Sequence, residues 1–421
     1  MARRYFGTDG VRGLVGHDLT PELVERLGRA AALWAGGGRV LVGRDTRGSG
    51  PELEAALARG IVSVGADAVL GGVLPTPAVA LFALDLGAVL SASHNPPEYN
   101  GVKLFDRDGR KLSDADEETI EALLDRPAEG EPGAVDRLEG AAERYAEHVV
   151  EHFGSDLSGL RLAVDCANGA LSTIAPAVLT RLGADVTALA DAPDGTNINV
   201  GCGATDLALL RRTVREGSFD LGVAFDGDGD RMLAVDSAGE VVDGDGILAI
   251  LALHLRARLV AVTTMTNLGF HRLMAEHGIR VVTTDVGDRY VLEALRREGG
   301  SLGGEQSGHL ISLAGHVTGD GLAAALLLCR ALEGRPLAEL AAPLERYPQR
   351  TENVRVRSKQ LPDSVLGEVA LVNAQLDGLG RVLVRPSGTE PLVRVLAEAP
   401  TPEEAERLCA RVAALVRREL G

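Results

Sequence analysis

The stretch from Ser91 to Lys103 carries more reactive side chains than a connecting segment needs. It reads Ser-Ala-Ser-His-Asn-Pro-Pro-Glu-Tyr-Asn-Gly-Val-Lys and follows the apolar run Leu81–Leu90. Adjacent prolines fix φ and cannot continue a helix or a sheet ladder. We therefore expect a strand that ends in a rigid loop, with Ser93 and His94 held at the strand's end, where functional residues often collect.

Lys103 is a lysine in a chain that nearly always uses arginine. Of the 43 basic residues only three are lysines, at positions 103, 111 and 359. An ammonium group can exchange a proton near neutrality, whereas a guanidinium cannot. Lys103 is therefore a candidate for proton transfer.

Three aspartates alternate with glycines in Asp226-Gly227-Asp228-Gly229-Asp230-Arg231, directly after the apolar run Leu221–Phe225. Carboxylates at this spacing repel one another unless a cation lies between them, and the glycines let the backbone curl inward. An EF-hand is excluded because its sixth and twelfth positions would be Arg231 and Ser237 instead of Gly and Glu. The motif predicts a site for a hard divalent cation, with a solvated acidic turn as the alternative, and Arg231 is placed to meet an anion beside the metal.

Two more loops have ligand-binding chemistry. Gly303-Gly304-Glu305-Gln306-Ser307-Gly308-His309 could bind sugar hydroxyls, and His309 could act as an acid or base, although a structural histidine is the alternative. Arg385-Pro386-Ser387-Gly388-Thr389-Glu390, with Arg394 nearby, has the ingredients of a phosphate pocket or of an ordinary hairpin turn.

Three shorter patterns are weaker. Arg12 lies among glycines that permit close approach to an anion. Gly43–Arg47 fits either a structural ion-pair turn or a phosphate contact, and Gly287–Tyr290 fits either a helix start or a ligand loop.

These loops must be positioned by regular elements, and three segments share one plan of strand, helix, Gly-containing turn and strand. They start at Arg39, Leu160 and Leu259, roughly 100 to 120 residues apart. The pattern predicts three related βαβ domains, residues 1–150, 151–243 and 244–346, with Asp125–Gly140 as the first linker.

The remaining residues, 347–421, predict a smaller α+β domain. Strand-like segments run over Val354–Arg357, Arg381–Arg385 and Pro391–Leu396, and Thr401 followed by Pro402 is a helix start.

Composition excludes several classes of protein. A net charge of −17 disfavours nucleic acid as a partner. No apolar run reaches the roughly 18 residues of a membrane span, and the start MARRYFGTDG is unlike a signal peptide, so we expect a cytoplasmic protein. The cysteines, at 166, 202, 329 and 409, are too scattered for a disulfide framework or zinc site and are expected to be small buried hydrophobes.

A serine nucleophile, a tri-aspartate loop, a sugar loop and a phosphate pocket together fit phosphoryl transfer on a phosphosugar. In this order, from Phe6 to the final helix, the motifs resemble the α-D-phosphohexomutase superfamily. The resemblance implies an α/β fold of three related mixed-sheet domains and a smaller C-terminal α+β domain in a heart-shaped arrangement. Its active site would lie where the four domains meet.

The resemblance also implies roles for individual residues. Ser93 would carry a phosphoryl group, as phosphoserine, and would hold Mg²⁺ together with Asp226, Asp228 and Asp230. Charge stabilisation and proton transfer would fall to Arg12, Lys103, Arg231 and His309. Substrate would be bound by Glu305 and Ser307 at the sugar and by Arg385, Ser387, Gly388, Thr389 and Arg394 at the phosphate that is not reacting.

The implied reaction interconverts glucosamine 6-phosphate and glucosamine 1-phosphate through a sugar 1,6-bisphosphate and feeds UDP-N-acetylglucosamine and cell-wall synthesis. Gln306 favours this amino-sugar branch, because hexose-preferring relatives usually carry Met there. Pro97-Glu98-Tyr99 resembles the hexose mutases instead. Activity on glucose or mannose phosphates therefore stays open, as does a non-catalytic phosphosugar-binding protein. The expected partner is a phosphosugar, with neither nucleic acid nor membrane, and a homodimer is compatible with the resemblance.

Overall fold

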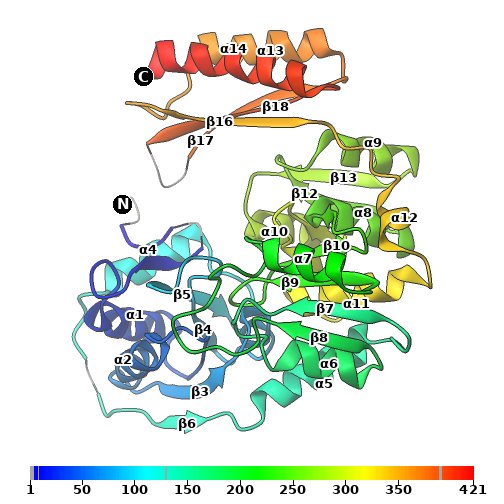
Figure 1. Ribbon diagram of the computed structural model, residues 1–421. Helices are drawn as coiled ribbons and strands as arrows, with labels where there is room; N and C mark the ends of the chain where they lie inside the picture. Colours follow the sequence, from blue (N-terminus) through cyan, green and yellow to red (C-terminus); the bar gives the residue numbers. More distant parts are fainter. Residues whose placement is uncertain (1–3, 8, 129, 388–390) are drawn as a thin grey trace. The chain divides into compact units, whose positions relative to one another are not determined.

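The computed structural model describes residues 4–7, 9–128, 130–387 and 391–421 (Figure 1). The chain divides into two compact units. The large unit comprises Met1–Thr264 and Ile279–Ala342, and the small unit comprises Met265–Gly278 and Pro343–Gly421. No helix in the described part of the chain is both long enough and apolar enough to cross a membrane.

The first sheet of the large unit has six strands in the order β1-β5-β4-β2-β3-β6. The pairs β2/β3, β2/β4 and β3/β6 are parallel, whereas β5 runs antiparallel to β1 and β4. The strands are β1 (Val11–Leu14), β2 (Arg39–Arg44), β3 (Asp67–Val73), β4 (Leu86–Leu90), β5 (Tyr99–Asp106) and β6 (Val135–Arg137). The helices of this region are α1 (Pro21–Trp34), α2 (Gly50–Val62), α3 (Thr76–Leu81) and α4 (Asp114–Leu123).

The second sheet has five strands in the order β11-β10-β9-β7-β8. They are β7 (Arg161–Asp165), β8 (Asp185–Leu189), β9 (Leu221–Phe225), β10 (Met232–Asp236) and β11 (Val241–Val242). The helices are α5 (Ala141–Phe153), α6 (Ile174–Arg181) and α7 (Ala208–Glu216). Helix α5 packs against α6 and α11.

The third sheet has four strands in the order β13-β12-β14-β15. They are β12 (Leu259–Thr263), β13 (Arg280–Thr284), β14 (Leu302–Gly304) and β15 (Leu310–Ser312). The helices of this part of the chain are α8 (Gly244–His254), α9 (Leu268–Glu276), α10 (Asp288–Glu298), α11 (Gly321–Leu332) and α12 (Leu337–Ala341). Of these, α9 belongs to the small unit.

The three sheets share a four-strand core, which confirms the predicted repeat. In each, two parallel strands joined by a helix (β2/β3, β7/β8 and β12/β13) are followed by a third parallel strand and a fourth antiparallel strand. The third and fourth strands are β4 and β5, β9 and β10, and β14 and β15. The turn between them is therefore at an equivalent place in all three sheets.

The small unit carries its own sheet, β16-β18-β17, which is fully antiparallel. Its elements are β16 (Gln349–Arg355), α13 (Asp363–Leu376), β17 (Arg381–Pro386), β18 (Leu392–Glu398) and α14 (Pro402–Leu420). Helix α14 begins as expected, because the Thr401 side chain accepts a hydrogen bond from the Glu404 backbone N–H at 3.2 Å. The predicted class, three related mixed-sheet domains and a smaller α+β domain, is confirmed.

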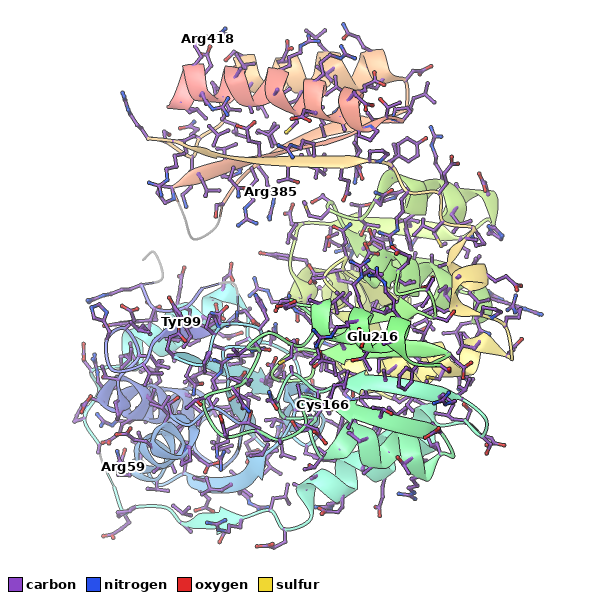
Figure 2. The ribbon with its side chains drawn as sticks, in the orientation of Figure 1. Arg59, Tyr99, Cys166, Glu216, Arg385 and Arg418 are labelled. Carbon is purple, nitrogen blue, oxygen red and sulfur yellow. The ribbon has the colours of Figure 1, made fainter. Side chains whose placement is uncertain are left out.

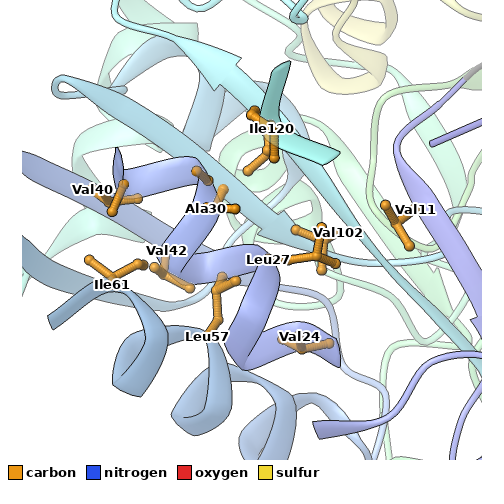
Figure 3. Close-up of a cluster of buried hydrophobic side chains, with 14 of the residues drawn as sticks. Val11, Val24, Leu27, Ala30, Val40, Val42, Leu57, Ile61, Val102 and Ile120 are labelled. Carbon is orange, nitrogen blue, oxygen red and sulfur yellow. The ribbon is translucent and has the colours of Figure 1, made fainter. Parts of the chain in front are cut away.

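Helices α1 and α2 cover the first sheet and close a large apolar cluster (Figure 3). Leu27 of α1, Leu57 of α2 and Val42 of β2 are buried there. The two helices can approach closely because a Cβ atom at Gly28 or at Gly60 would collide with the backbone of the other helix. This packing fixes β2, whose end leads into the Asp45–Arg47 turn.

Three local expectations are corrected. The expected linker Asp125–Gly140 contains the edge strand β6, and all three residues of β6 are exposed. Strand β16 begins at Gln349, before the expected Val354, and buries only one side chain. The apolar run Leu81–Leu90 is a strand only from Leu86, because its first residue ends α3. Backbone hydrogen bonds rather than buried side chains hold the two edge strands in place. Their sequences therefore show little hydrophobic pattern.

Candidate active site

The turns after β4 and β9 meet inside the large unit. The Ser93 hydroxyl donates a hydrogen bond of 2.6 Å to Oδ2 of Asp226. The Thr76 backbone N–H, at the start of α3, donates to the Asp228 carbonyl at 2.8 Å. Ser93 is only 1% exposed, and the three aspartates are buried. The structure therefore brings the predicted serine and the predicted acidic loop into direct contact.

Ser93 has φ of 54°, in the left-handed region that a non-glycine residue seldom occupies. Its backbone N–H donates to the Ser91 hydroxyl at 2.8 Å, and Ser91 in turn donates to Oδ2 of Asp45 at 2.6 Å. Strained conformations of this kind persist where the surroundings over-determine them, and they are frequent at functional sites.

Arg47 makes many of the contacts that hold Ser93 in this conformation. Its guanidinium donates to the main-chain carbonyls of Ser93 (2.9 Å), Asn95 (2.9 Å) and Tyr99 (2.8 Å) and to that of Pro96. The Arg47 side chain is 0% exposed and is paired with Asp45 at 2.9 Å. The open question about Gly43–Arg47 is answered in favour of a structural ion pair.

Asn199 completes this clamp from the second sheet's side. Its side-chain amide donates to the carbonyls of Ser93 and Asn95 at 2.9 and 3.0 Å. Arg47 and Asn199 were not predicted as site residues. Arg47 belongs to the Gly43–Arg47 pattern, but main-chain carbonyls have no sequence signature, so its contacts and those of Asn199 could not be predicted.

The three aspartates form a pocket for a cation. Ligand oxygens of Asp226, Asp228 and Asp230 all lie within 4.8 Å of one another. Among the described residues, Oδ1 of Asp228 and Oδ1 of Asp230 are buried and have no hydrogen-bond partner. Burial and the two other carboxylates raise the pKa of Asp226 well above its usual value. Unpartnered hard oxygens of this kind fit Mg²⁺.

Lys103 faces this pocket from β5. Its ammonium lies 2.6 Å from Oδ2 of Asp228 and 3.2 Å from Oδ2 of Asp230, and the side chain is 2% exposed. Burial acts to lower the pKa of Lys103, but the two aspartates outweigh it and the pKa is raised. Lys103 is thus held as a cation that can stabilise negative charge.

Arg12 and Arg231 lie at the same cluster. Arg12 pairs with Asp9, and Nε of Arg231 lies 3.8 Å from Oδ1 of Asp230. The Nε–H of each arginine is buried and has no acceptor in the described part of the chain. Two unsatisfied guanidinium donors beside a cation pocket suit an anion such as phosphate.

The turn between β14 and β15 brings His309 to the cluster. His309 lies between two carboxylates, with Nδ1 3.7 Å from Oδ1 of Asp230 and Nε2 3.3 Å from Oδ2 of Asp288. Burial opposes protonation of His309, but Asp288 and Asp230 outweigh it and raise its pKa. Asp288 is the first residue of α10, so Gly287–Tyr290 is a helix start, and Lys111 pairs with Asp288 at 2.8 Å.

Glu305 lies in the same turn. Its Oε1 accepts a hydrogen bond of 3.2 Å from the Gly287 N–H. Burial and the nearby Asp288 raise the pKa of Glu305. Ser307 is exposed, as a residue that binds a ligand from solvent would be.

The predicted phosphate residues belong to the small unit and are described by themselves. Arg385 on β17, labelled in Figure 2, is the cross-strand partner of Arg394 on β18. The Ser387 carbonyl accepts a hydrogen bond of 2.9 Å from Lys359. Gly388 and Thr389 lie outside the described residues.

Comparisons with known proteins agree with this geometry. The four phosphoglucomutase/phosphomannomutase domain models match in order. Alpha/beta/alpha domains I, II and III match residues 3–131, 141–239 and 243–347, and the C-terminal domain matches residues 352–415.

Curated relatives match over nearly the whole chain. The phosphoglucosamine mutases of Symbiobacterium thermophilum and Geobacillus thermodenitrificans are 49% and 45% identical to it, each with 99% of both chains covered.

Solved structures match as well. A phosphoglucomutase/phosphomannomutase family protein from Burkholderia thailandensis has a TM-score of 0.85 at 25% identity, covering 100% of this chain and 98% of that one. Aspergillus fumigatus N-acetylphosphoglucosamine mutase, solved with GlcNAc-6P and magnesium, shares the fold with a TM-score of 0.73 at 20% identity, covering 99% and 96%. With its four domain models in order and relatives of this similarity, the chain belongs to the phosphoglucomutase/phosphomannomutase family, the α-D-phosphohexomutases.

Proposed function

We propose that this chain catalyses the phosphoglucosamine mutase reaction, the interconversion of glucosamine 6-phosphate and glucosamine 1-phosphate. The observation that carries the proposal is the 2.6 Å contact between the Ser93 hydroxyl and Asp226 at the edge of the aspartate pocket. A nucleophile at this position would lie beside both a divalent cation and the transferring phosphoryl group. The choice of an amino sugar as the substrate rests on the names of the relatives, which are phosphoglucosamine mutases.

Mg²⁺ would be held by Asp226, Asp228 and Asp230, together with an oxygen of the phosphorylated Ser93. When bound, it supplies positive charge against the oxygens of the transferring phosphoryl group. Phosphorylation adds about −1.5 to −2 charge beside three carboxylates, which a divalent cation would offset.

The reaction begins with Ser93 phosphorylated. The P–O bond to Ser93 breaks while a new P–O bond forms to O1 of glucosamine 6-phosphate, giving the 1,6-bisphosphate. The sugar hydroxyl loses one proton and the serine oxygen gains one, and we assign this exchange to Lys103 and His309. The bisphosphate then turns end for end, and Ser93 takes the 6-phosphate, leaving glucosamine 1-phosphate.

Arg12 and Arg231 would stabilise the charge on the transferring group through their unsatisfied N–H donors. Glu305 and Ser307 would bind the sugar. Arg385, Ser387, Gly388, Thr389 and Arg394 would hold the phosphate that is not reacting. One pocket must then accept either phosphate in turn, which suits a site rich in arginine.

The test is a coupled assay with glucosamine 6-phosphate, Mg²⁺ and a catalytic amount of a sugar 1,6-bisphosphate. Ser93→Ala should lose at least about 10³-fold in kcat, because the acceptor oxygen is gone. Ser237→Ala, at an exposed serine, is the control and should retain full activity. Near-wild-type turnover by Ser93→Ala would contradict the mechanism.

Hexose phosphates are the second candidate substrates, favoured by Pro97-Glu98-Tyr99 and by the names of the family models. The ratio of kcat/KM for glucosamine 6-phosphate to that for glucose or mannose phosphates decides between them. If no substrate is turned over and intact mass never shows phosphate on Ser93, a phosphosugar-binding role is favoured instead.

We also propose that function divides along four domains, residues 1–150, 151–243, 244–346 and 347–421. They would carry the serine, metal, sugar and phosphate loops in turn. Two further statements stay predictions, namely that the protein forms a homodimer and that it is cytoplasmic. Light scattering in solution tests the first of these.

A further inference from the structure

A cavity of about 430 Å³ lies beside α10 in the large unit, apart from the residues assigned to catalysis. One wall comes from the end of α1 and the segment between β5 and α4, and the other from α10. Ser93, the three aspartates, Glu305 and His309 do not line it. Its volume is in the range of sites for small organic molecules.

The carboxylates on its wall are already engaged. Oδ1 of Asp106 accepts hydrogen bonds from the backbone N–H groups of Asp108 and Arg110, both at 2.9 Å. Asp116 accepts from the Ser113 N–H at 3.1 Å in the capping box of α4. Glu293 lies 3.9 Å from Arg289. Asp106 and Asp116 therefore accept hydrogen bonds from backbone N–H groups rather than pairing with a cation of the wall.

Two of the four cations are fully paired. Lys111 lies 2.5 Å from Asp9 and 2.8 Å from Asp288, and Arg289 lies 2.7 Å from Asp114. These pairs join the two walls and fix the shape of the cavity. Lys111 also links the cavity to the catalytic cluster, since its partner Asp288 contacts His309.

The other two cations, Arg110 and Arg296, are less tightly paired. Arg296 donates to the Val317 carbonyl at 3.3 Å, and no carboxylate of the described chain lies within 4 Å of it. Arg110 pairs with the exposed Asp108 at 3.5 Å. Burial and the like charge of Arg110 lower the pKa of Arg296 and outweigh the opposing effect of Asp106 and Asp108. In a chain of net charge −17, two neighbouring under-compensated guanidiniums are a local exception.

Trp34, the single tryptophan of the chain, also lines the cavity. It is the last residue of α1 and is partly buried. An indole ring in the lining of a cavity can pack against a flat organic ring while arginines of the same lining bind an anion. It also reports on the cavity by its fluorescence.

We propose that this cavity binds a phosphate-bearing small molecule, with Arg110 and Arg296 binding the phosphate and Trp34 contacting the rest of the ligand. The shared chemistry is the phosphate group, which could come from an inorganic polyphosphate or from a nucleotide. Inorganic pyrophosphate and ADP are the two probes that separate these sources.

The experiment follows Trp34 fluorescence while pyrophosphate or ADP is added to the full chain in magnesium-free buffer. Both probes should change the signal saturably, and Arg296→Gln should weaken binding at least about tenfold, because a charge-assisted contact is lost. The matched control is Arg297→Gln on the same helix, whose side chain is 67% exposed and paired with Glu298. It should bind as the wild type does.

Arg385→Gln tests whether the signal comes from the phosphate residues of the proposed active site, and it should leave the titration unchanged. Tighter binding of ADP would identify a ring-bearing ligand, and equal binding a simple polyphosphate. Either result supports the proposal. It is overturned if neither probe binds below about millimolar concentration, the weak end of specific affinities, or if Arg296→Gln binds as tightly as Arg297→Gln.

Discussion

The position of Ser93 depends on hydrogen bonds to its own loop. A non-glycine residue in a sparsely populated conformation costs about 1 to 3 kcal/mol. Four carbonyls of the loop from Ser93 to Tyr99 accept hydrogen bonds from Arg47, and Asn199 donates to two of them. This clamp offsets the strain and holds the nucleophile in place before substrate arrives.

Arg47→Lys should lower kcat by about 10- to 100-fold and leave KM within a few-fold. An ammonium keeps the charge beside Asp45 but cannot reach four carbonyls in a plane, so Ser93 is misplaced while the fold persists. Steady-state kinetics and intact mass, which counts phosphate on Ser93, are the measurements.

Arg44→Lys is the control for that variant. Arg44 ends the same strand, and its side chain pairs with Glu54 of α2 at 3.6 Å instead of binding the carbonyls of the serine loop. If Arg47→Lys keeps kcat within twofold of Arg44→Lys, Arg47 does not position the nucleophile.

The cysteines should be inert in the folded protein. All four are free and buried, as expected from the sequence, and Cys166 is labelled in Figure 2. Burial raises the pKa of Cys202 and of Cys329 to about 12. Because the thiolate is the reactive form, Ellman's reagent at pH 8 should titrate fewer than about one thiol in the native protein. It should titrate all four in guanidinium; rapid native reaction of a full equivalent would contradict this.

At the scale of elements, three of the functional loops occupy one topological position. The Ser93 loop joins β4 to β5, the aspartate loop joins β9 to β10, and the Glu305–His309 loop joins β14 to β15. In each sheet this is the carboxyl end of the third parallel strand, before the antiparallel strand. Ligands in α/β sheets bind at such carboxyl ends. A repeated fold thus supplies three different chemistries.

The sequence predicted the repeated βαβ units and the motifs, because buried strands and glycine-rich loops have strong local patterns. It did not predict β6 and predicted only the end of β16, because both are edge strands with few buried side chains. It also missed the roles of Arg47 and Asn199, whose carbonyl partners lie far away in the chain. Asp288 was found only as part of an ambiguous pattern, since its contact with His309 is tertiary.

His271 should make the small unit sensitive to acid. This histidine is on α9, its Nε2 is buried without an acceptor among the described residues, and burial followed by the charge of Arg381 lowers its pKa from 6.5 to about 4. Between these values the unfolded chain binds a proton that the folded chain does not. The free energy of unfolding therefore contains a favourable contribution above pH 6.5 that is lost as the pH falls toward 4, up to about 3 kcal/mol.

Calorimetry at pH 7 and pH 4.5 measures this effect. His271→Leu should lose less thermal stability on acidification than the wild type, because it removes the titrating group. His277→Gln, at the C-cap of the same helix, should behave like the wild type. Identical pH dependence in His271→Leu and the wild type would show that His271 is not responsible.

At the scale of the whole molecule, the two compact units have separate apolar cores. The cluster around α1 and α2 lies within the large unit, and the cluster beneath α13 and α14 lies within residues 354–416 of the small unit. Chains built from such units need not unfold in one cooperative step. We therefore expect two thermal unfolding transitions. The fluorescence of Trp34 should report only the unfolding of the large unit.

A matched pair of core variants separates the two transitions. Val42 on β2 and Val395 on β18 are both fully buried, so replacing either by alanine should cost roughly 2 kcal/mol in its own unit. The small unit has about 90 residues, and its unfolding entropy is correspondingly small. Val395→Ala should lower its transition by on the order of 10 °C, whereas Val42→Ala should lower that of the large unit by a few degrees. Calorimetry together with Trp34 fluorescence measures both transitions. Val395→Ala should leave the midpoint temperature of the fluorescence transition unchanged. A single transition that both variants lower equally would mean that the units unfold as one.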